Sequence, residues 1–287
     1  MKILLKTYNH LGDTVCLTAA LRNAKAAYPD FTFGYQGNYA DVFLNNPDLD
    51  VLDESDADLV VEIGYRAFPQ RFPTGGNLCE RQSLALAIEL SRFTGRIFDV
   101  VVKRPVIFLS EEEMNDRPDI GRYCVLNANC QKCSEVKGYP HWQQVVDARR
   151  DVTFVQVGGN ESRDISMNLR NVVDARGRTS IRKLFSLVRN ASSVLSPSSA
   201  VVHIAAAFPG VKAFCLTGAR EPTALTAYPN VRHFHTTCGE YCENHGCMKF
   251  NLQVNEKKCQ SVMTVDGRKY ARCMFDISPK EVASCLP

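Results

Sequence analysis

The residues best placed to do chemistry lie between Ser196 and Pro222, in the stretch SPSSAVVHIAAAFPGVKAFCLTGAREP. An apolar run of strand type ends just before it, and Ser198 or Ser199 offers a side-chain oxygen that can cap a helix over residues 200–208. A second apolar run, residues 211–216, follows that helix. The pattern predicts a β-α-β unit. The free N–H groups at the start of its helix would lie at the carboxyl edge of a sheet, where phosphate groups bind.

Three further residues of this unit are candidates for contact with a ligand. Ala200 is the first residue of the predicted helix, and Gly218 opens the loop after the second apolar run. His203 lies about one turn into the helix, where it can either face the cleft or pack inside.

Asp13 is the first candidate for acid-base chemistry. It follows a predicted strand over residues 2–7 and stands at the start of a predicted helix over residues 14–28. It can serve there as a capping carboxylate or as a general base at the edge of a sheet.

Lys137 and Glu161 are charged residues of the second half of the chain. Lys137 lies in a turn-rich loop after a predicted strand over residues 123–126, where a lone lysine is usually solvated. Glu161 follows a strand over residues 154–157 and a Gly-Gly turn. A carboxylate there can accept hydrogen bonds from two ribose hydroxyls, or it can be a charge at the start of a helix.

Five cysteines fall close together near the C-terminus, in a segment with little regular apolar period. They are Cys238, Cys242, Cys247, Cys259 and Cys273. Such a segment cannot bury much apolar surface, so a bound metal ion can supply the stability that a hydrophobic core would otherwise give. Four thiolates favour one structural zinc or iron ion, and the sequence does not separate the two metals. Reduced structural cysteines are the alternative.

The predicted elements alternate between strands and helices, which indicates an α/β protein. Apolar runs at 31–36, 51–52, 59–63 and 106–109 are the other predicted strands of the first half. We expect an N-terminal unit over residues 1–118, a second unit over 119–235, and a Cys-rich segment with a closing helix over 236–287.

The composition excludes several classes of protein. The net charge of +3 is too small to demand a polyanionic partner. No apolar stretch reaches the length of a signal-peptide core or a membrane span, so we expect a cytoplasmic protein. Twelve cysteines in such a chain favour buried thiols or metal ligation over disulfides. The first turn also lacks the Gly-x-Gly-x-x-Gly pattern of a dinucleotide-dependent oxidoreductase.

Five short segments resemble motifs of glycosyltransferase family 9, the heptosyltransferases, and occur in the order of that family. They are Leu11 to Arg22 with Gly12-Asp13, Lys137 to Trp142, Gly158 to Glu161, Ser198 to Pro222, and Cys273 to Val282.

The resemblance implies a GT-B fold, with two Rossmann-like domains facing a cleft. It implies that Asp13 deprotonates the acceptor hydroxyl and that Lys137 meets donor phosphate. Donor contacts are then expected from Gly12, Glu161 and the segment Ser198 to His203, together with Gly218. No catalytic divalent metal ion is expected.

The implied function is inverting transfer of a heptose or related sugar from a nucleotide-sugar donor, ADP-linked by preference. The acceptor would be a hydroxyl of a glycan, a protein or another molecule. The cysteine spacing is similar to the iron finger of autotransporter heptosyltransferases. This implies Cys238, Cys242, Cys259 and Cys273 as ligands, with Cys247 as a possible replacement, and it leaves a homo-oligomer open.

The chain departs from the family at two positions near the predicted donor site. Ser198 stands where family members usually have an aspartate, and Arg220 replaces a threonine. Heptose as the transferred sugar is therefore an open question. A sugar-nucleotide epimerase of the same fold and a non-catalytic protein that binds a partner through its metal finger are the alternative interpretations.

Overall fold

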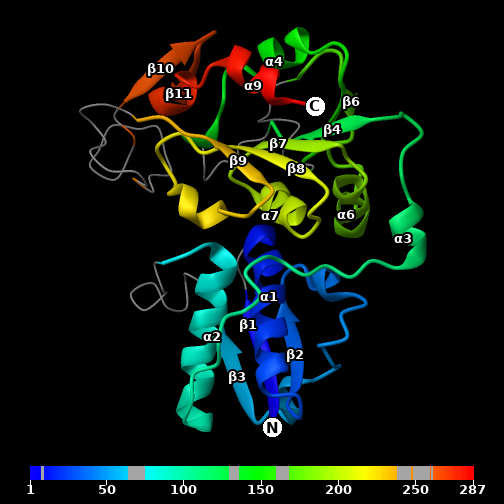
Figure 1. Cartoon of the computed structure of the whole chain (residues 1–287), viewed down its shortest axis with the longest axis vertical. Coiled ribbons are helices and arrows are strands. Elements are labelled where there is room, and N and C mark those ends of the chain that lie inside the picture. The colour runs from blue at the N-terminus through cyan, green and yellow to red at the C-terminus, as the bar shows by residue number, and fades with distance from the viewer. Residues whose placement is uncertain are drawn as a thin grey trace.

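The computed structural model describes residues 1–7, 10–63, 75–128, 136–159, 168–237, 247, 259 and 261–287. These residues form two α/β units that lie end to end and are joined by one long connection (Figure 1). Both units contain parallel sheets, as the alternation of apolar runs predicts.

The first unit has a small parallel sheet with the strand order β2-β1-β3. Its elements are β1 (Lys2–Thr7), α1 (Leu11–Ala27), β2 (Thr32–Gly37), the 3-10 turns η1 (Ala40–Phe43) and η2 (Glu54–Asp56), β3 (Leu59–Glu62) and α2 (Leu78–Thr94). The predicted strand at residues 51–52 is wrong, because these residues form no ladder and Val51 is fully exposed.

Helix α1 begins at Leu11, three residues before the predicted start. The backbone N–H of His10 donates to Asp13 Oδ2 over 3.2 Å, so this carboxylate caps the helix from inside its first turn. Val15, Leu17 and Leu21 are fully buried on its inner face, as their spacing predicts.

The connection between the units runs over residues 95–122 and contains the short helix α3 (Glu111–Asn115). The predicted strand over 106–109 is wrong. The N–H of Val106 donates to the Thr18 hydroxyl over 2.9 Å, and Asn23 Oδ1 accepts from the N–H groups of Val101 and Val102. Side chains of α1 thus satisfy backbone groups that a neighbouring strand would otherwise satisfy.

The second unit has a six-stranded parallel sheet with the order β6-β5-β4-β7-β8-β9. Its elements are β4 (Tyr123–Leu126), α4 (Trp142–Ala148), β5 (Thr153–Gln156), β6 (Val173–Asp174), α6 (Ile181–Arg189), β7 (Ser193–Pro197), α7 (Ala200–Ala206), β8 (Lys212–Leu216), the 3-10 turn η4 (Thr223–Thr226) and β9 (Val231–Phe234). Strands β5 and β6 follow β4 toward one edge of the sheet, and strands β8 and β9 follow β7 toward the other edge. The pair β4 and β7 is therefore the point at which the strand order reverses.

The C-terminal part adds an antiparallel hairpin and two helices to the second unit. These are β10 (Val262–Val265), β11 (Arg268–Ala271), α8 (Arg272–Phe275) and α9 (Pro279–Cys285). Helix α9 lies beside α4 (Figure 1), and Ser278 Oγ accepts its capping bond from the N–H of Glu281 at 3.4 Å. None of the described helices combines the length and the apolar character that crossing a bilayer requires.

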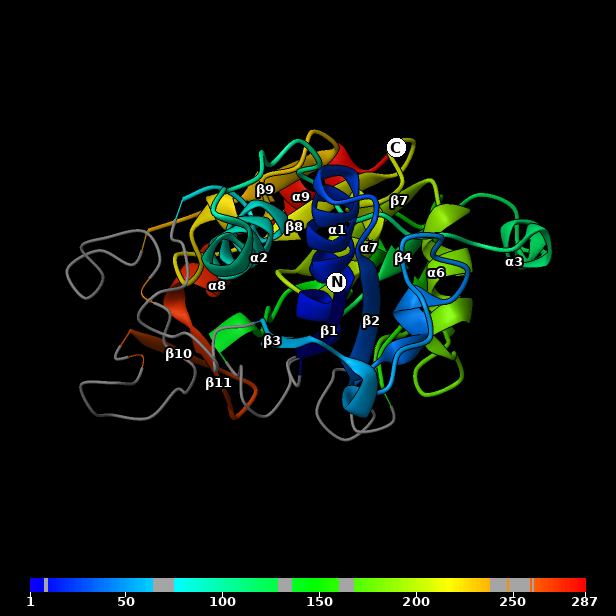
Figure 2. The same ribbon diagram turned by 90° about the horizontal axis from the view of Figure 1, so that it is seen from below.

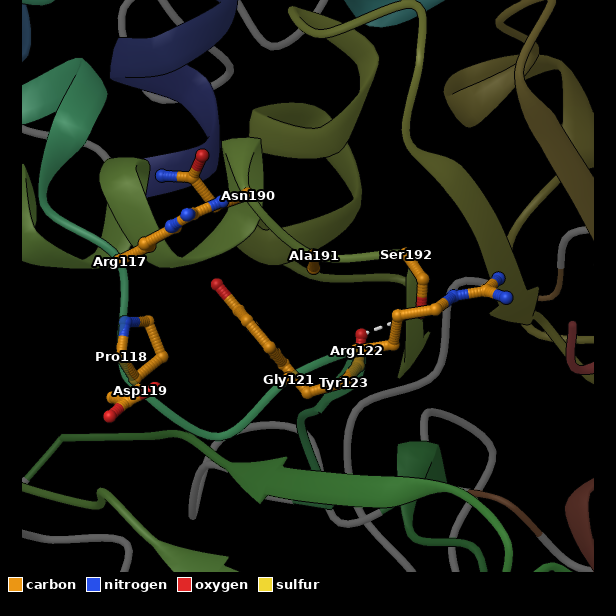
Figure 3. A pocket seen from close by; sticks show the side chains of 9 residues that line it. All are labelled: Arg117, Pro118, Asp119, Gly121, Arg122, Tyr123, Asn190, Ala191 and Ser192. Atoms are coloured by element: carbon orange, nitrogen blue, oxygen red, sulfur yellow. Dashed lines mark hydrogen bonds between the residues drawn. The ribbon is translucent and has the colours of Figure 1, made fainter.

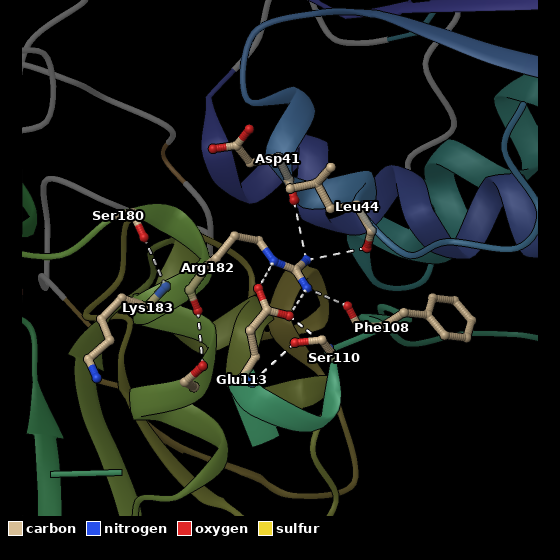
Figure 4. Close-up of polar contacts among 9 residues, drawn as sticks. Asp41, Leu44, Phe108, Ser110, Glu113, Ser180, Arg182 and Lys183 are labelled. Carbon is tan, nitrogen blue, oxygen red and sulfur yellow. Dashed lines mark hydrogen bonds and ion pairs between the residues drawn. The ribbon is translucent and has the colours of Figure 1, made fainter. Parts of the chain in front are cut away.

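Arg182 of α6 ties the two units and their connection together (Figure 4). Its guanidinium donates to both carboxylate oxygens of Glu113 in α3, at 2.6 and 2.5 Å, and to the carbonyl of Phe108 at 2.6 Å. It also reaches the carbonyls of Asp41 and Leu44 in the first unit, at 3.3 and 3.5 Å. One buried side chain thus bonds to three separate segments. We call Arg182 together with these hydrogen bonds the Arg182 hub.

Candidate active site

Among the described residues, the predicted catalytic and donor-site candidates lie where the carboxyl edges of the two sheets face each other. Asp13 follows β1, whose neighbours β2 and β3 lie on opposite sides of it. Lys137 lies after β4 and Ser198 after β7, the two strands at which the second sheet reverses its order. Ligands of open parallel sheets bind outside the carboxyl ends of strands at such a reversal.

Gly12 and Ala200 show how closely the units approach. A Cβ atom at Gly12 would lie 3.1 Å from His203 Cδ2 and 3.4 Å from the Cα of Ala200. The first turn of α1 therefore rests directly on the first turn of α7, and Figure 1 shows the two helices meeting end to end. Glycine is favoured there by the close approach rather than by an unusual backbone angle.

Asp13 is partly buried and electrostatically connected to the second unit. Burial raises the pKa of its carboxyl group above its ordinary value, and the charge and backbone N–H of His10 oppose this. The positive charge of Lys137 also lowers the pKa of Asp13, while the negative charge of Glu221 raises it. The carboxylate of Asp13 in the first unit is thus electrostatically coupled to Lys137 and Glu221 in the second unit.

His203 packs inside the protein and does not face the cleft, which is one of the two positions that the sequence allows. The ring is 6% exposed, and its Nδ1 lies 2.9 Å from Tyr228 Oη and 3.2 Å from Cys16 Sγ. Cys79 Sγ also lies 3.5 Å from Tyr228 Oη. Burial lowers the pKa of His203 to about 4, which keeps the ring neutral at the seam between the units.

Lys137 is paired inside the second unit. Its Nζ lies 2.9 Å from Glu221 Oε1 and donates to the backbone carbonyl of Ser198 over 2.8 Å. Arg220 pairs with the same Glu221 oxygen. Burial alone would raise the pKa of Glu221, but the charges of Lys137 and Arg220 and a hydrogen bond with Ser198 lower it to about 2. Glu221 therefore stays ionised throughout the physiological range.

Ser199 is the cap of α7. Its Oγ accepts from the N–H of Val201 at 3.3 Å and from Asn127 Nδ2 at 3.1 Å, and it lies 2.8 Å from Ser196 Oγ. These bonds fasten the end of β4 to the start of α7. Of the two serines offered by the sequence, Ser199 is therefore the one that caps the helix.

Gly218 lies in the loop that follows β8 and carries Arg220 and Glu221. Its φ of +55° is in the left-handed region, and a Cβ there would lie 2.8 Å from Met274 Sδ and 3.0 Å from Cys273 Sγ. The backbone N–H of Cys247 donates to the carbonyl of the next residue, Ala219, over 3.4 Å. The cysteine segment thus supports the loop that carries Arg220 and Glu221.

Several predicted contacts fall outside the described residues, namely those of Glu161, Cys238 and Cys242. Cys259 and Cys273 are both buried and belong to one apolar cluster. No three ligating side chains come together within the part of the chain that the structure describes. The predicted ligand set therefore stays a prediction.

A separate cavity of about 570 Å³ lies at the opposite edge of the second sheet, at the amino ends of β4 and β7 (Figure 3). It is lined by Arg117, Pro118, Asp119, Gly121, Arg122, Tyr123, Asn190, Ala191 and Ser192. None of the predicted site residues contributes to it. Its place at the amino edge of the strands also makes it a poor candidate for the active site.

The sequence analysis missed Glu221, although it singled out Arg220 beside it. The signal was a carboxylate flanked by Arg220 and Pro222 in a loop after a strand. Its partner Lys137 is distant in sequence, and only the fold brings the two charges together.

Comparisons with known proteins identify the fold. No family model and no curated protein matches the chain. Among solved structures, a family 9 glycosyl transferase from Veillonella parvula is 15% identical, with a TM-score of 0.64 and coverage of 82% of this chain and 86% of that one. The ADP-heptose LPS heptosyltransferase II of E. coli is 13% identical, with a TM-score of 0.58 and coverage of 99% and 97%.

The iron-containing, dodecameric heptosyltransferase TibC of E. coli, solved with ADP-D-β-D-heptose, is also similar. It is 12% identical, with a TM-score of 0.67 and coverage of 99% of this chain and 74% of that one. The expected resemblance is confirmed at the level of the fold: this chain has the two-unit α/β architecture of the family 9 glycosyltransferases and heptosyltransferases.

Proposed function

We propose that this chain is an inverting glycosyltransferase. It moves a heptose or a related sugar from an ADP-linked donor to a hydroxyl group of a glycan or protein acceptor. One observation carries the proposal: Asp13 of the first unit and Lys137 of the second lie close enough for their charges to interact, beside the reversal point of the second sheet. The fold shared with heptosyltransferases supports it, and ADP-heptose in the TibC complex supports the choice of donor.

In the proposed step, the acceptor oxygen attacks the anomeric carbon of the donor sugar while Asp13 takes the hydroxyl proton. A bond forms between that oxygen and the anomeric carbon, and the bond from the carbon to the phosphate oxygen breaks. The electron pair leaves with the nucleoside diphosphate. The raised pKa of Asp13 suits a base that must accept a proton near neutral pH.

Lys137 faces the charge that develops on the leaving diphosphate. A fixed ammonium group in a partly dehydrated site stabilises such charge more strongly than water does. Its exposure of 22% leaves the side chain accessible to a ligand while its stem is held in the protein. Ser199 and Asn127 hold the neighbouring backbone in place, so the donor meets a preformed surface.

The first test separates donor binding from chemistry. We expect ADP and ADP-sugars to raise the melting temperature of the wild type and of Asp13→Asn alike, because ligands that bind only the native state stabilise it. Transfer to an acceptor should fall by about 10³-fold or more in the variant, since the base is lost. Near-normal transfer by Asp13→Asn would remove Asp13 from this role.

Product analysis distinguishes the remaining functions. A glycosyltransferase releases free ADP in proportion to the glycosylated acceptor. An epimerase changes the nucleotide sugar without an acceptor, and a non-catalytic binding protein does neither.

The proposal includes one structural zinc or iron ion held by Cys238, Cys242, Cys259 and Cys273. The burial of Cys259 and Cys273 in one cluster supports it, as does the iron in TibC. Such an ion would fasten the C-terminal segment beneath the loop of Gly218. Elemental analysis of the purified protein measures the metal, and light scattering measures whether the chain forms a homo-oligomer like the dodecameric TibC.

A further inference from the structure

Two of the three N–H donors of the Lys137 ammonium are already used within the protein. One points to the carbonyl of Ser198 at 2.8 Å, and the ammonium also pairs with Glu221 Oε1 at 2.9 Å. The group proposed to meet the donor diphosphate therefore has an anion beside it before any donor arrives.

The partners of Glu221 differ in how firmly they are held. The Arg220 side chain is 3% exposed, whereas that of Lys137 is 22% exposed. Arg220 also shares its loop with Gly218, which is packed against Cys273 and Met274. If one of the two ion pairs opens, Lys137 is the partner that can move, because it alone reaches solvent.

Opening the ion pair between Lys137 and Glu221 does not leave the buried Glu221 carboxylate without a partner. Glu221 is 8% exposed, and an unpaired carboxylate at that depth would be costly. Arg220 and the Ser198 hydroxyl remain beside it when Lys137 leaves. A diphosphate carries more negative charge than one carboxylate and offers more acceptor oxygens, so it can compete for the ammonium.

We propose that Glu221 is a resident counter-anion for Lys137, which the diphosphate of the nucleotide-sugar displaces, so that Lys137 exchanges one anion for another when donor binds. The inference rests on the proposed function, because the incoming anion is that of the donor. It makes Glu221 a positioning residue: it holds Lys137 ready and opposes the diphosphate. After transfer it takes Lys137 back and so speeds the release of the nucleoside diphosphate.

The test compares wild type with Glu221→Gln, which keeps the shape of the side chain and removes its charge. Titration calorimetry with ADP should show about tenfold tighter binding in the variant, because no ion pair has to open. ADP should also dissociate more slowly in stopped-flow displacement. Adenosine has no phosphate, so its affinity should not change.

Two further variants serve as controls. Lys137→Met combined with Glu221→Gln should lose the gain, because the exchanging ammonium is gone. Glu113→Gln removes another ionised carboxylate that pairs with a buried arginine, Arg182, and that belongs to α3 in the connection between the units. We expect its affinity for ADP to equal that of the wild type, whatever its effect on stability.

A second measurement uses the wild type alone and so does not depend on the folding of Glu221→Gln. A carbodiimide couples a lysine amine to an adjacent carboxylate with loss of water. Mass spectrometry should find a cross-link between Lys137 and Glu221 in the free protein, and saturating ADP or pyrophosphate should reduce it several-fold.

The outcomes separate the inference from the proposed function. Weaker or unchanged ADP binding by Glu221→Gln, or a cross-link insensitive to ADP, overturns the exchange and leaves the glycosyltransferase proposal standing. A wild type that binds no nucleotide, together with tighter pyrophosphate binding by the variant, removes the proposed function and keeps the exchange. If neither ADP nor pyrophosphate binds either protein, both ideas fail.

Discussion

At the scale of single residues, His203 makes stability depend on pH. Burial lowers its pKa to about 4, whereas an unfolded histidine titrates near 6.5. Between these values the unfolded chain binds more protons than the native protein, so stability falls as pH falls through that window. The contribution is present above pH ~6.5 and is lost by pH ~4, with an upper size of about 3 kcal/mol.

We therefore expect the wild type to lose melting temperature between pH 6.5 and 4 more steeply than His203→Gln does. His233 is partly buried and also has a lowered pKa, so it contributes with the same sign in both proteins. The difference between the two melting curves isolates His203. Parallel curves over this range would show that the ring is not held neutral at the seam.

At the scale of elements, the loop after β8 depends on the C-terminal segment. Gly218→Ala has to place a Cβ at φ +55° against Met274 Sδ and Cys273 Sγ. A left-handed alanine costs about 1 kcal/mol, and the close contacts add to it, so we expect a loss of about 1–3 kcal/mol. Urea unfolding measures the change, and ADP affinity should fall with it, because Gly218 is itself a predicted donor contact.

Gly210 provides the matched control for that substitution. It ends the segment between α7 and β8, its φ is not positive, and a Cβ there meets nothing within 4 Å. Gly210→Ala should change stability by no more than about 0.5 kcal/mol. Equal effects at Gly210 and Gly218 would contradict the proposed support from the cysteine segment.

Most elements of the sheets could be predicted because their apolar runs are continuous. The runs at β1, β4 and β8 are bounded by turn residues and are buried in the structure. The run at 106–109 has the same pattern, yet its backbone bonds go to side chains of α1, which no local pattern reveals. The start of α1 was placed too late because the bond from the His10 N–H to Asp13 adds a turn before the predicted boundary.

The candidate site could be predicted only in part. Asp13, Lys137 and Ser198 each follow a recognisable strand, so topology places each of them at the carboxyl edge of its own sheet. The pairing of Lys137 with Glu221 and the cluster of His203 with Cys16 and Tyr228 depend on how two units meet. Contacts between segments so far apart in sequence need the tertiary structure.

At the scale of the whole molecule, the Arg182 hub determines how the units are joined. Arg182→Met would leave the Glu113 carboxylate and the carbonyls of Phe108, Asp41 and Leu44 without this donor. Breaking a buried ion pair costs about 3–5 kcal/mol. Hydrogen exchange should show faster exchange in residues 106–116 than in wild type.

Arg272 provides the control, since it pairs with Asp276 on the surface and both side chains are largely exposed. Arg272→Met should change stability by at most about 1 kcal/mol and leave exchange in the connection unaltered. Similar losses in both variants would mean that the hub contributes no more than a surface ion pair.

The hub lies to one side of the interface between the two units. Helices α3 and α6 lie on one side of the molecule and α2 on the other, in both views (Figures 1 and 2). The polar contacts between the units near α2 join neutral groups, with Asn77 Nδ2 at 3.4 Å from the Ala227 carbonyl and Cys79 Sγ at 3.5 Å from Tyr228 Oη. The hub bonds to Glu113 and Phe108 are 2.5 to 2.6 Å long. A rotation of one unit against the other that kept these bonds would have its pivot at Arg182, and the units would then separate most beside the start of α2.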